Sequence, residues 1–175
     1  DELNNINKIL GLKHGKVYES LTELRYGSIM ILTDADLDGS HIKGLLINMF
    51  HNFWPSLLKH EGFLKSMITP IIKAQHKKTV KEFYTMIEYD DWKNQDDRSK
   101  WSIKYYKGLG TSTSKEAKEY FKKLDDSEVN YVWNDDNEVN SNVELAFSKN
   151  NADLRKKWLE SYDKKEILDY TDKNI

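Results

Sequence analysis

Three aspartates at alternate positions, Asp34, Asp36 and Asp38, have the residue type and spacing best suited to chemistry in this sequence. They follow an apolar run at residues 29–32 that is typical of a buried strand, and they precede an amphipathic helix pattern beginning near His41. Ligands bind at the carboxyl ends of strands in open α/β sheets. Because neighbouring carboxylates repel one another, keeping them ionised requires a cation. The stretch therefore predicts a site for Mg²⁺, with Mn²⁺ or Ca²⁺ as alternatives, on a strand-to-helix turn.

The acidic stretch has two other interpretations besides a metal site. An EF-hand calcium loop begins with the same spacing, but its twelfth position, counted from Asp34, is Leu45 instead of the required Glu. The segment before Asp34 also has the pattern of a strand, whereas an EF-hand needs a helix there. An acidic turn without metal, in which Asp38 or Ser40 caps the following helix, stays open as an alternative.

The composition limits the classes of protein that the sequence can represent. The chain has 175 residues, 38% of them hydrophobic, which is enough for one domain with a small appendage. Its formal net charge is −2, so nucleic acid would have to be bound by a local basic patch. The absence of cysteine excludes a disulfide framework and a thiolate zinc site. We expect no membrane span and no signal peptide, because no apolar run is long enough and the first residues are polar.

The first third of the chain has the pattern of an α/β unit. Apolar residues at helical spacing predict a helix over residues 3–10, and a second short helix is expected at 18–24. After the strand and the acidic turn, an apolar stripe at positions i, i+3, i+4 and i+7 predicts a long helix that packs on the sheet. Pro55 is expected to kink or restart that helix.

The middle of the chain is expected to be rich in strands. Residues 63–75 and 80–89 have strand composition, and Pro70 within the first run implies a sheet edge or a bend. Residues 101–106 alternate apolar and polar side chains, as a half-buried strand does. This strand-rich section, about residues 63–106, follows the α/β unit as an insertion.

A glycine-rich turn at residues 107–110 leads into another predicted helix. Thr113 and Glu116 have the Thr-x-x-Glu spacing of a capping box, and apolar residues at helical spacing follow them. Free backbone N–H groups at such a helix start attract phosphate, although two glycines here also suit an ordinary tight turn.

The last part of the sequence is acidic and then basic. Residues 125–142 are rich in Asp and Asn, and we expect a loop there around one strand at 131–133. Apolar residues from Leu154 to Tyr162 predict a helix beside a basic cluster. That cluster is either a solvated flank with an Asp153–Lys157 pair or a surface for phosphate. It consists of Arg155, Lys156 and Lys157.

Three blocks of the sequence together resemble one known family. Residues 33–44 resemble the acidic motif of the Toprim domain in type II DNA topoisomerases, and residues 106–116 look like a second block of that family. A third block is formed by residues 146–149 and 152–159. The order and spacing of the blocks agree with the family over nearly the whole chain, and their details are closer to the eukaryotic enzymes than to bacterial gyrase.

The resemblance implies a fold and a division into domains. We expect an α/β Toprim fold, a Rossmann-like parallel sheet with helices that is incomplete at its N-terminal edge. In this interpretation residues 1–125 form the Toprim domain, including the strand-rich insertion. Residues 126–162 form a loop and a basic helix, and residues 163–175 form a linker towards a downstream winged-helix domain.

The resemblance also implies which residues bind metal and DNA. The family's metal ligands correspond to Asp34, Asp36 and, more peripherally, Asp38. Arg155 and Lys156 match positions that contact DNA in the family, and weaker candidates for the DNA side are Lys107, Lys43 and His41.

The implied activity is transient cleavage of both strands of one duplex, passage of a second duplex and religation, driven by ATP. The family's tyrosine nucleophile, its ATP site and the Toprim Glu-Gly-Asp-Ser-Ala motif are absent from these residues, so we expect them elsewhere in a longer protein. The chain alone is therefore expected to contain no catalytic residue and to be inactive. The longer protein is expected to be a nuclear homodimer that acts on double-stranded DNA with Mg²⁺.

Two other functions remain as alternatives. One is another Toprim phosphoryl-transfer enzyme, such as a nuclease or a primase, which needs no downstream tyrosine. The other is a non-catalytic DNA-binding module in which the aspartates only cap a helix, so that its DNA binding would not depend on metal.

Overall fold

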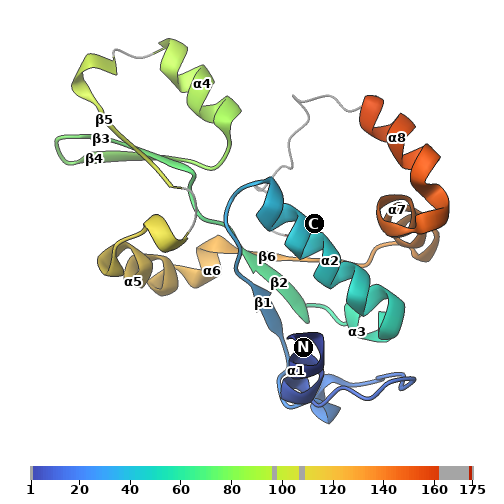
Figure 1. Ribbon diagram of the computed structural model, residues 1–175. Coiled ribbons are helices and arrows are strands. Elements are labelled where there is room, and N and C mark those ends of the chain that lie inside the picture. The colour runs from blue at the N-terminus through green and yellow to red at the C-terminus, as the bar shows by residue number, and fades with distance from the viewer. Residues whose placement is uncertain (1, 96–97, 107–108, 162–173, 175) are drawn as a thin grey trace. The chain divides into compact units, whose positions relative to one another are not determined.

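The computed structural model describes residues 2–95, 98–106, 109–161 and 174 (Figure 1). The chain divides into two compact units. Unit 1 consists of residues 1–31, 43–66 and 129–175, and unit 2 consists of residues 32–42 and 67–128. Helix α2 (Leu37–Phe53) contributes residues to both units. No helix in the described ranges is long and apolar enough to cross a membrane.

Unit 1 contains a small sheet with helices around it. The strands are β1 (Ile29–Ile31), β2 (Leu64–Met67) and β6 (Glu128–Asn130), in the order β1-β2-β6. The helical elements are α1 (Glu2–Leu10), η1 (Leu21–Glu23), α2, α3 (Pro55–Leu58), α7 (Asp136–Phe147), η4 (Lys149–Asn151) and α8 (Ala152–Glu160). Helix α2 ends at Phe53 and α3 begins at Pro55, so the predicted restart at this proline is confirmed.

The expected parallel sheet is only partly present. Strands β1 and β2 are parallel, with Ile29 opposite Leu64. On the other side of β2, the Tyr131 N–H donates to the Leu64 carbonyl at 3.0 Å, and the Ile68 N–H donates to the Ser127 carbonyl at 2.8 Å. Residue 64 of β2 is thus bonded to residue 131, whereas residue 68, further along the chain, is bonded to the earlier residue 127. The two strands therefore run in opposite directions, and β6 is antiparallel to β2. The α/β class is therefore confirmed, with one parallel pair among the described strands of this sheet.

The core of unit 1 is built from large aromatic side chains. Trp54, Phe50 and Phe63 are almost completely buried, and the rings of Phe50 and Phe63 meet edge to face at 5.5 Å between centroids. The buried indole of Trp54 donates its Nε1–H to the Lys13 carbonyl at 2.9 Å, which satisfies its polar atom. The apolar stripe predicted on α2 is confirmed in part, because Met49 and Phe50 are buried in this core, whereas Ile42, Leu45 and Phe53 are exposed.

Helix α7 was not expected, because residues 125–142 were predicted as a loop. Asp135 caps it by accepting hydrogen bonds from the N–H groups of Asn137 and Glu138 at 2.9 and 3.0 Å. Its half-buried side chains include Val139, Val143 and Phe147, one helical turn apart. The predicted strand at 131–133 was also misplaced, since β6 occupies residues 128–130.

Unit 2 contains the predicted strand-rich insertion. Strands β3 (Ile72–His76), β4 (Thr79–Phe83) and β5 (Ser102–Tyr105) form an antiparallel sheet in the order β4-β3-β5. Pro70 lies between β2 and β3, so the predicted bend in residues 63–75 is confirmed. The other elements of this unit are α4 (Met86–Gln95), η2 (Arg98–Lys100), η3 (Leu109–Thr111), α5 (Ser114–Lys122) and α6 (Leu124–Ser127).

The prediction of a strand over residues 80–89 was wrong in its second half, where α4 begins. The Glu88 N–H donates to Thr85 Oγ1 at 3.2 Å, and the Thr85 N–H donates to the Glu88 carboxylate at 3.1 Å. This reciprocal pair is a capping box, so a sequence signal for the helix was present. The helix then covers one face of the sheet through Tyr89 and Trp92, which pack on Phe83.

The contact between α2 and α7 at Gly44 leads to a prediction about stability. A Cβ added at Gly44 would lie 2.8 Å from Cζ of Phe147, which is too close without a shift of the ring. We expect Gly44→Ala to destabilise the chain by about 1–2 kcal/mol in urea unfolding, although alanine has the higher helix propensity by about 1 kcal/mol. Gly27→Ala, where a Cβ meets nothing within 4 Å, is the control. A gain of stability in Gly44→Ala would contradict this packing.

Candidate metal and nucleic-acid site

The acidic turn connects β1 to α2 and is held by its own backbone. The Gly39 N–H donates to Oδ1 of Asp36 at 2.7 Å, and the Ser40 N–H donates to the Asp36 carbonyl at 3.0 Å. Asp36 is therefore the residue that caps α2, a role that the sequence had suggested for Asp38 or Ser40. One oxygen of the Asp36 carboxylate is engaged by this bond.

Gly39 allows the turn to fold tightly against the start of the helix. A Cβ at this position would lie 2.0 Å from the carbonyl oxygen of Asp34 and 3.1 Å from Cβ of Thr33. No side chain fits there unless the backbone of the turn moves. The glycine in the acidic motif thus fixes the path of the chain between Asp34 and the first turn of α2.

The three aspartates share this turn, and all three side chains are exposed. No group of three His, Cys, Asp or Glu residues in the described part of the chain lies close enough together to hold a metal ion. The chemistry of the donors nevertheless suits a hard divalent cation, because Mg²⁺ is commonly held by one or two carboxylates and several waters. Asp34 and Asp36 offer such oxygens at a strand end, and Asp36 keeps a second oxygen beside the one that accepts from Gly39.

Arg155 lies in the predicted basic helix, and the structure gives it a structural role. Its Nη1 donates to the carbonyls of Leu145, Ala146 and Ser148 at 3.0, 2.9 and 3.2 Å. These carbonyls belong to the C-terminal end of α7, where a cation is favoured by the helix dipole. Arg155 therefore connects α8 to the C-terminal end of α7 by bonds from its side chain to the backbone of α7.

The other candidates for the DNA side have different environments. Lys156 is exposed and lies 3.7 Å from Asp153, so the expected pair with Lys157 is replaced by one with Lys156. His41 is exposed on α2, whereas burial of Lys43 lowers the pKa of its ammonium group. Lys107 lies outside the described residues.

A network around Glu116 joins β5 to the start of α5. Thr113 caps α5 and forms the predicted capping box with Glu116, whose carboxylate accepts from the Thr113 N–H at 2.7 Å. The same carboxylate accepts from the Tyr106 hydroxyl at 2.5 Å and from Lys104 Nζ at 3.0 Å. Tyr106 and Thr113, which flank residues 107–112, are thus tied to one side chain.

The hydrogen bonds of this network shift two pKa values. Donation by the Tyr106 hydroxyl, and next by the Thr113 N–H, lowers the pKa of Glu116 to about 2. Burial of Tyr106, and then its bond to Glu116, raises the pKa of the phenol. At neutral pH the network therefore consists of an ionised carboxylate and a protonated phenol.

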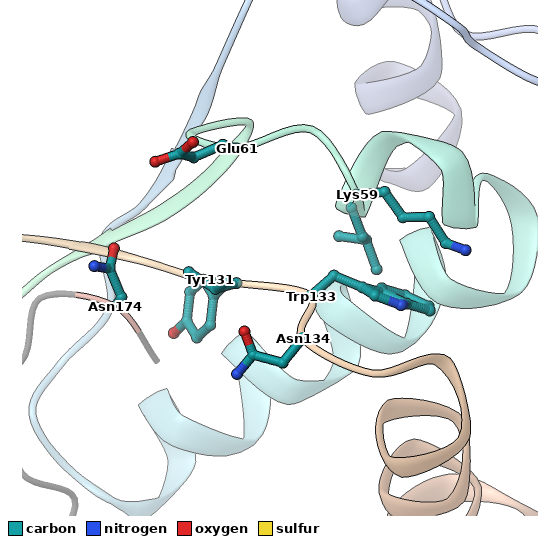
Figure 2. Close-up of a pocket in the computed structure, with 8 residues that line it drawn as sticks. Lys59, Glu61, Tyr131, Trp133, Asn134 and Asn174 are labelled. Carbon is teal, nitrogen blue, oxygen red and sulfur yellow. The ribbon is translucent and has the colours of Figure 1, made fainter.

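Unit 1 also contains a pocket of about 480 Å³ beside Trp133 (Figure 2). Lys59 lies over the Trp133 ring, with Nζ 5.2 Å from its centroid, and forms an ion pair with Asp136 at 2.7 Å. The Trp133 Nε1–H donates to the same carboxylate at 2.6 Å. The bond to Lys59, followed by that to Trp133, lowers the pKa of Asp136. The charged residues that line the pocket are Lys59 and Glu61, and because their charges are opposite, the pocket offers no strong net charge to a ligand.

Comparison with known proteins identifies the family. The protein-family model that describes the C-terminal associated domain of Toprim matches residues 67–175 of this chain. The chain belongs to this family. The resemblance to the Toprim region of eukaryotic type II topoisomerases, first seen in residues 33–44 and 106–116, is confirmed by the relatives described next.

The chain is similar to proteins named DNA topoisomerase 2. It is 56% identical over 161 residues to a probable DNA topoisomerase 2 of Dictyostelium discoideum, covering 91% of this chain and 10% of that protein. It is 53% identical over 165 residues to DNA topoisomerase 2 of Arabidopsis thaliana, covering 92% of this chain and 11% of that protein. The chain thus spans about a tenth of the length of these curated relatives.

A solved structure has the same fold. It is the crystal structure of the Plasmodium falciparum topoisomerase II DNA-binding, cleavage and re-ligation domain, with a TM-score of 0.93 and 45% sequence identity. The match covers all of this chain and 24% of that chain.

The close approach at Gly39 predicts the effect of a single methyl group. We expect Gly39→Ala to destabilise the chain by about 3 kcal/mol in urea unfolding, because its Cβ would meet backbone instead of a flexible side chain. Ser40→Ala, at the next and exposed position, is a matched control that should change stability by less than about 0.5 kcal/mol. Equal stability of the two variants would show that the turn is not packed in this way.

The Glu116 network predicts a dependence of stability on pH. The pKa of Glu116 falls from an ordinary 4.5 to about 2 on folding, so its contribution is complete above pH 4.5 and is lost as the pH falls towards 2. We expect a contribution of about 1–2 kcal/mol after allowing for solvent screening. Glu116→Gln should lose that stability at neutral pH and show a weaker decline in acid. Glu119→Gln, an exposed position on the same helix, should decline as the unmodified chain does; parallel curves for all three proteins would refute this role of Glu116.

Proposed function

We propose that this chain is the metal-binding and DNA-contacting part of an ATP-dependent type II DNA topoisomerase. Such an enzyme cleaves both strands of one duplex transiently, passes a second duplex through the gap and reseals the break. The observation that carries the proposal is the likeness, over the whole chain, to a domain whose name includes DNA binding, cleavage and re-ligation. The acidic turn, whose path is fixed by Gly39, provides the chemical group that such a reaction needs.

In this proposal Asp34 and Asp36 hold Mg²⁺, and Asp38 lies at the edge of the site. When bound, the cation would supply positive charge that stabilises the phosphate and the leaving oxygen. The protein's own contribution is to place the carboxylates. The bond from the Gly39 N–H orients Asp36, and the backbone contact with Gly39 restrains Asp34.

Basic side chains of this chain would position the DNA backbone. Lys156 and His41 are exposed and are proposed to contact phosphate, whereas the candidate Lys107 lies outside the described residues. Lys43 is half-buried, and the lowered pKa of its ammonium group reflects the cost of its desolvation, which a phosphate would offset. Arg155 would act indirectly, because its guanidinium keeps α8 in place against the end of α7.

Other parts of the reaction would be supplied by other regions of a longer protein. The tyrosine nucleophile, the Toprim glutamate and the ATP site are assigned to them, and the active form would be a nuclear homodimer. Within the described residues β1 lies at an edge of its sheet, which leaves space for the strand that carries the missing glutamate. We assign residues 1–125 to the Toprim domain and residues 126–162 to the predicted basic-helix region, in which the structure also has helix α7. The predicted linker at 163–175, towards a winged-helix domain, lies outside the described residues except for residue 174.

One observation favours the alternative of a non-catalytic DNA-binding module. Asp36 caps α2, and it therefore has a structural role that does not depend on metal. Asparagine caps helices as well as aspartate does, but it carries no negative charge. Asp36→Asn therefore separates the two roles, since it preserves the cap and weakens a metal site.

The test is cleavage of supercoiled plasmid by the complete protein that contains this chain, in the presence of Mg²⁺. We expect protein-linked double-strand breaks from the unmodified protein and a loss of about 100-fold or more in Asp34→Ala and Asp36→Asn. Asp126→Asn, an exposed aspartate on α6, should cleave normally. Normal cleavage by Asp34→Ala would mean that the acidic turn is structural, and protein-free breaks would favour a nuclease.

A further inference from the structure

The turn between β3 and β4 places two lysines where a hairpin normally has other residues. His76 pairs with Thr79, so Lys77 and Lys78 form a two-residue loop at one tip of the sheet (Figure 1). Lys77 has φ +54, a left-handed conformation that favours asparagine or glycine. The sequence therefore keeps a charged side chain at a position where backbone conformation alone would select another residue, and such exceptions occur often at functional sites.

More positive charge collects at the same end of the sheet. In the register of β3 and β4, Lys81 lies opposite Ala74. His76 is two residues further along β3 than Ala74, so its side chain points to the same face of the sheet as that of Lys81. The His76 ring lies 5.4 Å from that of Trp101. Lys81 Nζ lies 5.3 Å from the Trp101 centroid and 5.2 Å from that of Trp92. The two indole rings thus hold the Lys81 ammonium group near the tip.

In the described parts of this hairpin and of α4, the acidic residues are Glu82, Glu88, Asp90 and Asp91. The hairpin strands with their loop, residues 72–83, contain four lysines and one acidic residue, Glu82. Glu82 is engaged with Lys73 at 2.6 Å, three pairs away from the loop. On α4, Asp90 and Asp91 are exposed, and Asp90 is 3.6 Å from Lys93. The charge of the loop is therefore not cancelled within its own hairpin.

We propose that the β3–β4 tip, defined as His76, Lys77, Lys78 and Lys81, binds the phosphates of duplex DNA as a contact additional to the acidic turn. Lysine ammonium groups act as point charges and suit phosphate oxygens without reading base sequence. The choice of DNA over another polyanion rests on the proposed function. The tip adds affinity that does not depend on sequence, in a chain whose net charge of −2 gives no overall attraction to DNA.

The test uses the complete protein and a fluorescent duplex of about 60 bp, with anisotropy measured over a series of salt concentrations. The variant is Lys77→Asn with Lys78→Gln, which removes both charges and places a residue that tolerates φ +54, so the hairpin should fold at least as well. We expect binding about ten-fold weaker near physiological salt and a salt slope smaller by about two. Lys122→Gln with Lys123→Gln, two exposed consecutive lysines at the end of α5, is the matched control and should bind as the unmodified protein does.

Two results would overturn the proposal. The first is unchanged affinity and salt slope in the Lys77/Lys78 variant. The second is a loss of binding to polyglutamate with DNA binding intact, which would assign the tip to an acidic protein partner. Relaxation of supercoiled plasmid, measured beside these titrations, separates this proposal from the proposed function. Weaker DNA binding by the Lys77/Lys78 variant supports the proposed contact, even if the unmodified protein fails to relax plasmid DNA. If the unmodified protein relaxes DNA and the variant binds DNA as tightly as it does, only the proposed contact is refuted.

Discussion

The acidic turn depends on one close contact, between the Cα of Gly39 and the carbonyl of Asp34. This contact lets the chain leave β1, turn and enter α2 within a few residues, with Asp36 bonded to the Gly39 N–H. The same helix then supplies Phe50 to the aromatic core of unit 1. The turn thus sets where α2 begins, and α2 in turn contributes to the core of unit 1.

Charged side chains in this protein often stabilise backbone as well as offering charge. Asp36 caps α2, Arg155 binds the carbonyls at the end of α7, and Glu116 binds the Thr113 N–H at the start of α5. Each bond satisfies groups that a helix end leaves unpaired. Loss of function in a variant at one of these positions must therefore be compared with its stability, and substitutions that preserve the hydrogen bond are the informative ones.

The distribution of charge is more informative than its sum. The formal net charge of −2 would argue against nucleic acid, yet the β3–β4 tip is locally basic. In unit 2 the tryptophans that pack against the small core also lie against the Lys81 ammonium group. Packing and the positioning of charge thus come from the same aromatic residues, as expected for a small sheet with one covered face.

The sequence alone determined the features that depend on residues close together in the chain. The alternation of Asp34, Asp36 and Asp38 after a strand, the restart at Pro55 and the Thr113–Glu116 cap all involve neighbours within a few positions. The family resemblance was also visible there. The metal and DNA roles of the candidate residues remain predictions.

Tertiary structure decided the features in which distant segments meet. Helix α7 is polar in sequence and has only a small apolar face. That face stabilises the helix because Phe147 packs on Gly44, which lies about one hundred residues earlier in the chain. The bonds of Glu116 to Tyr106 and Lys104, and of Arg155 to the end of α7, join different elements, so no local pattern could predict them. Local patterns fix where helices and turns form, whereas long-range packing selects which side chains remain available for chemistry.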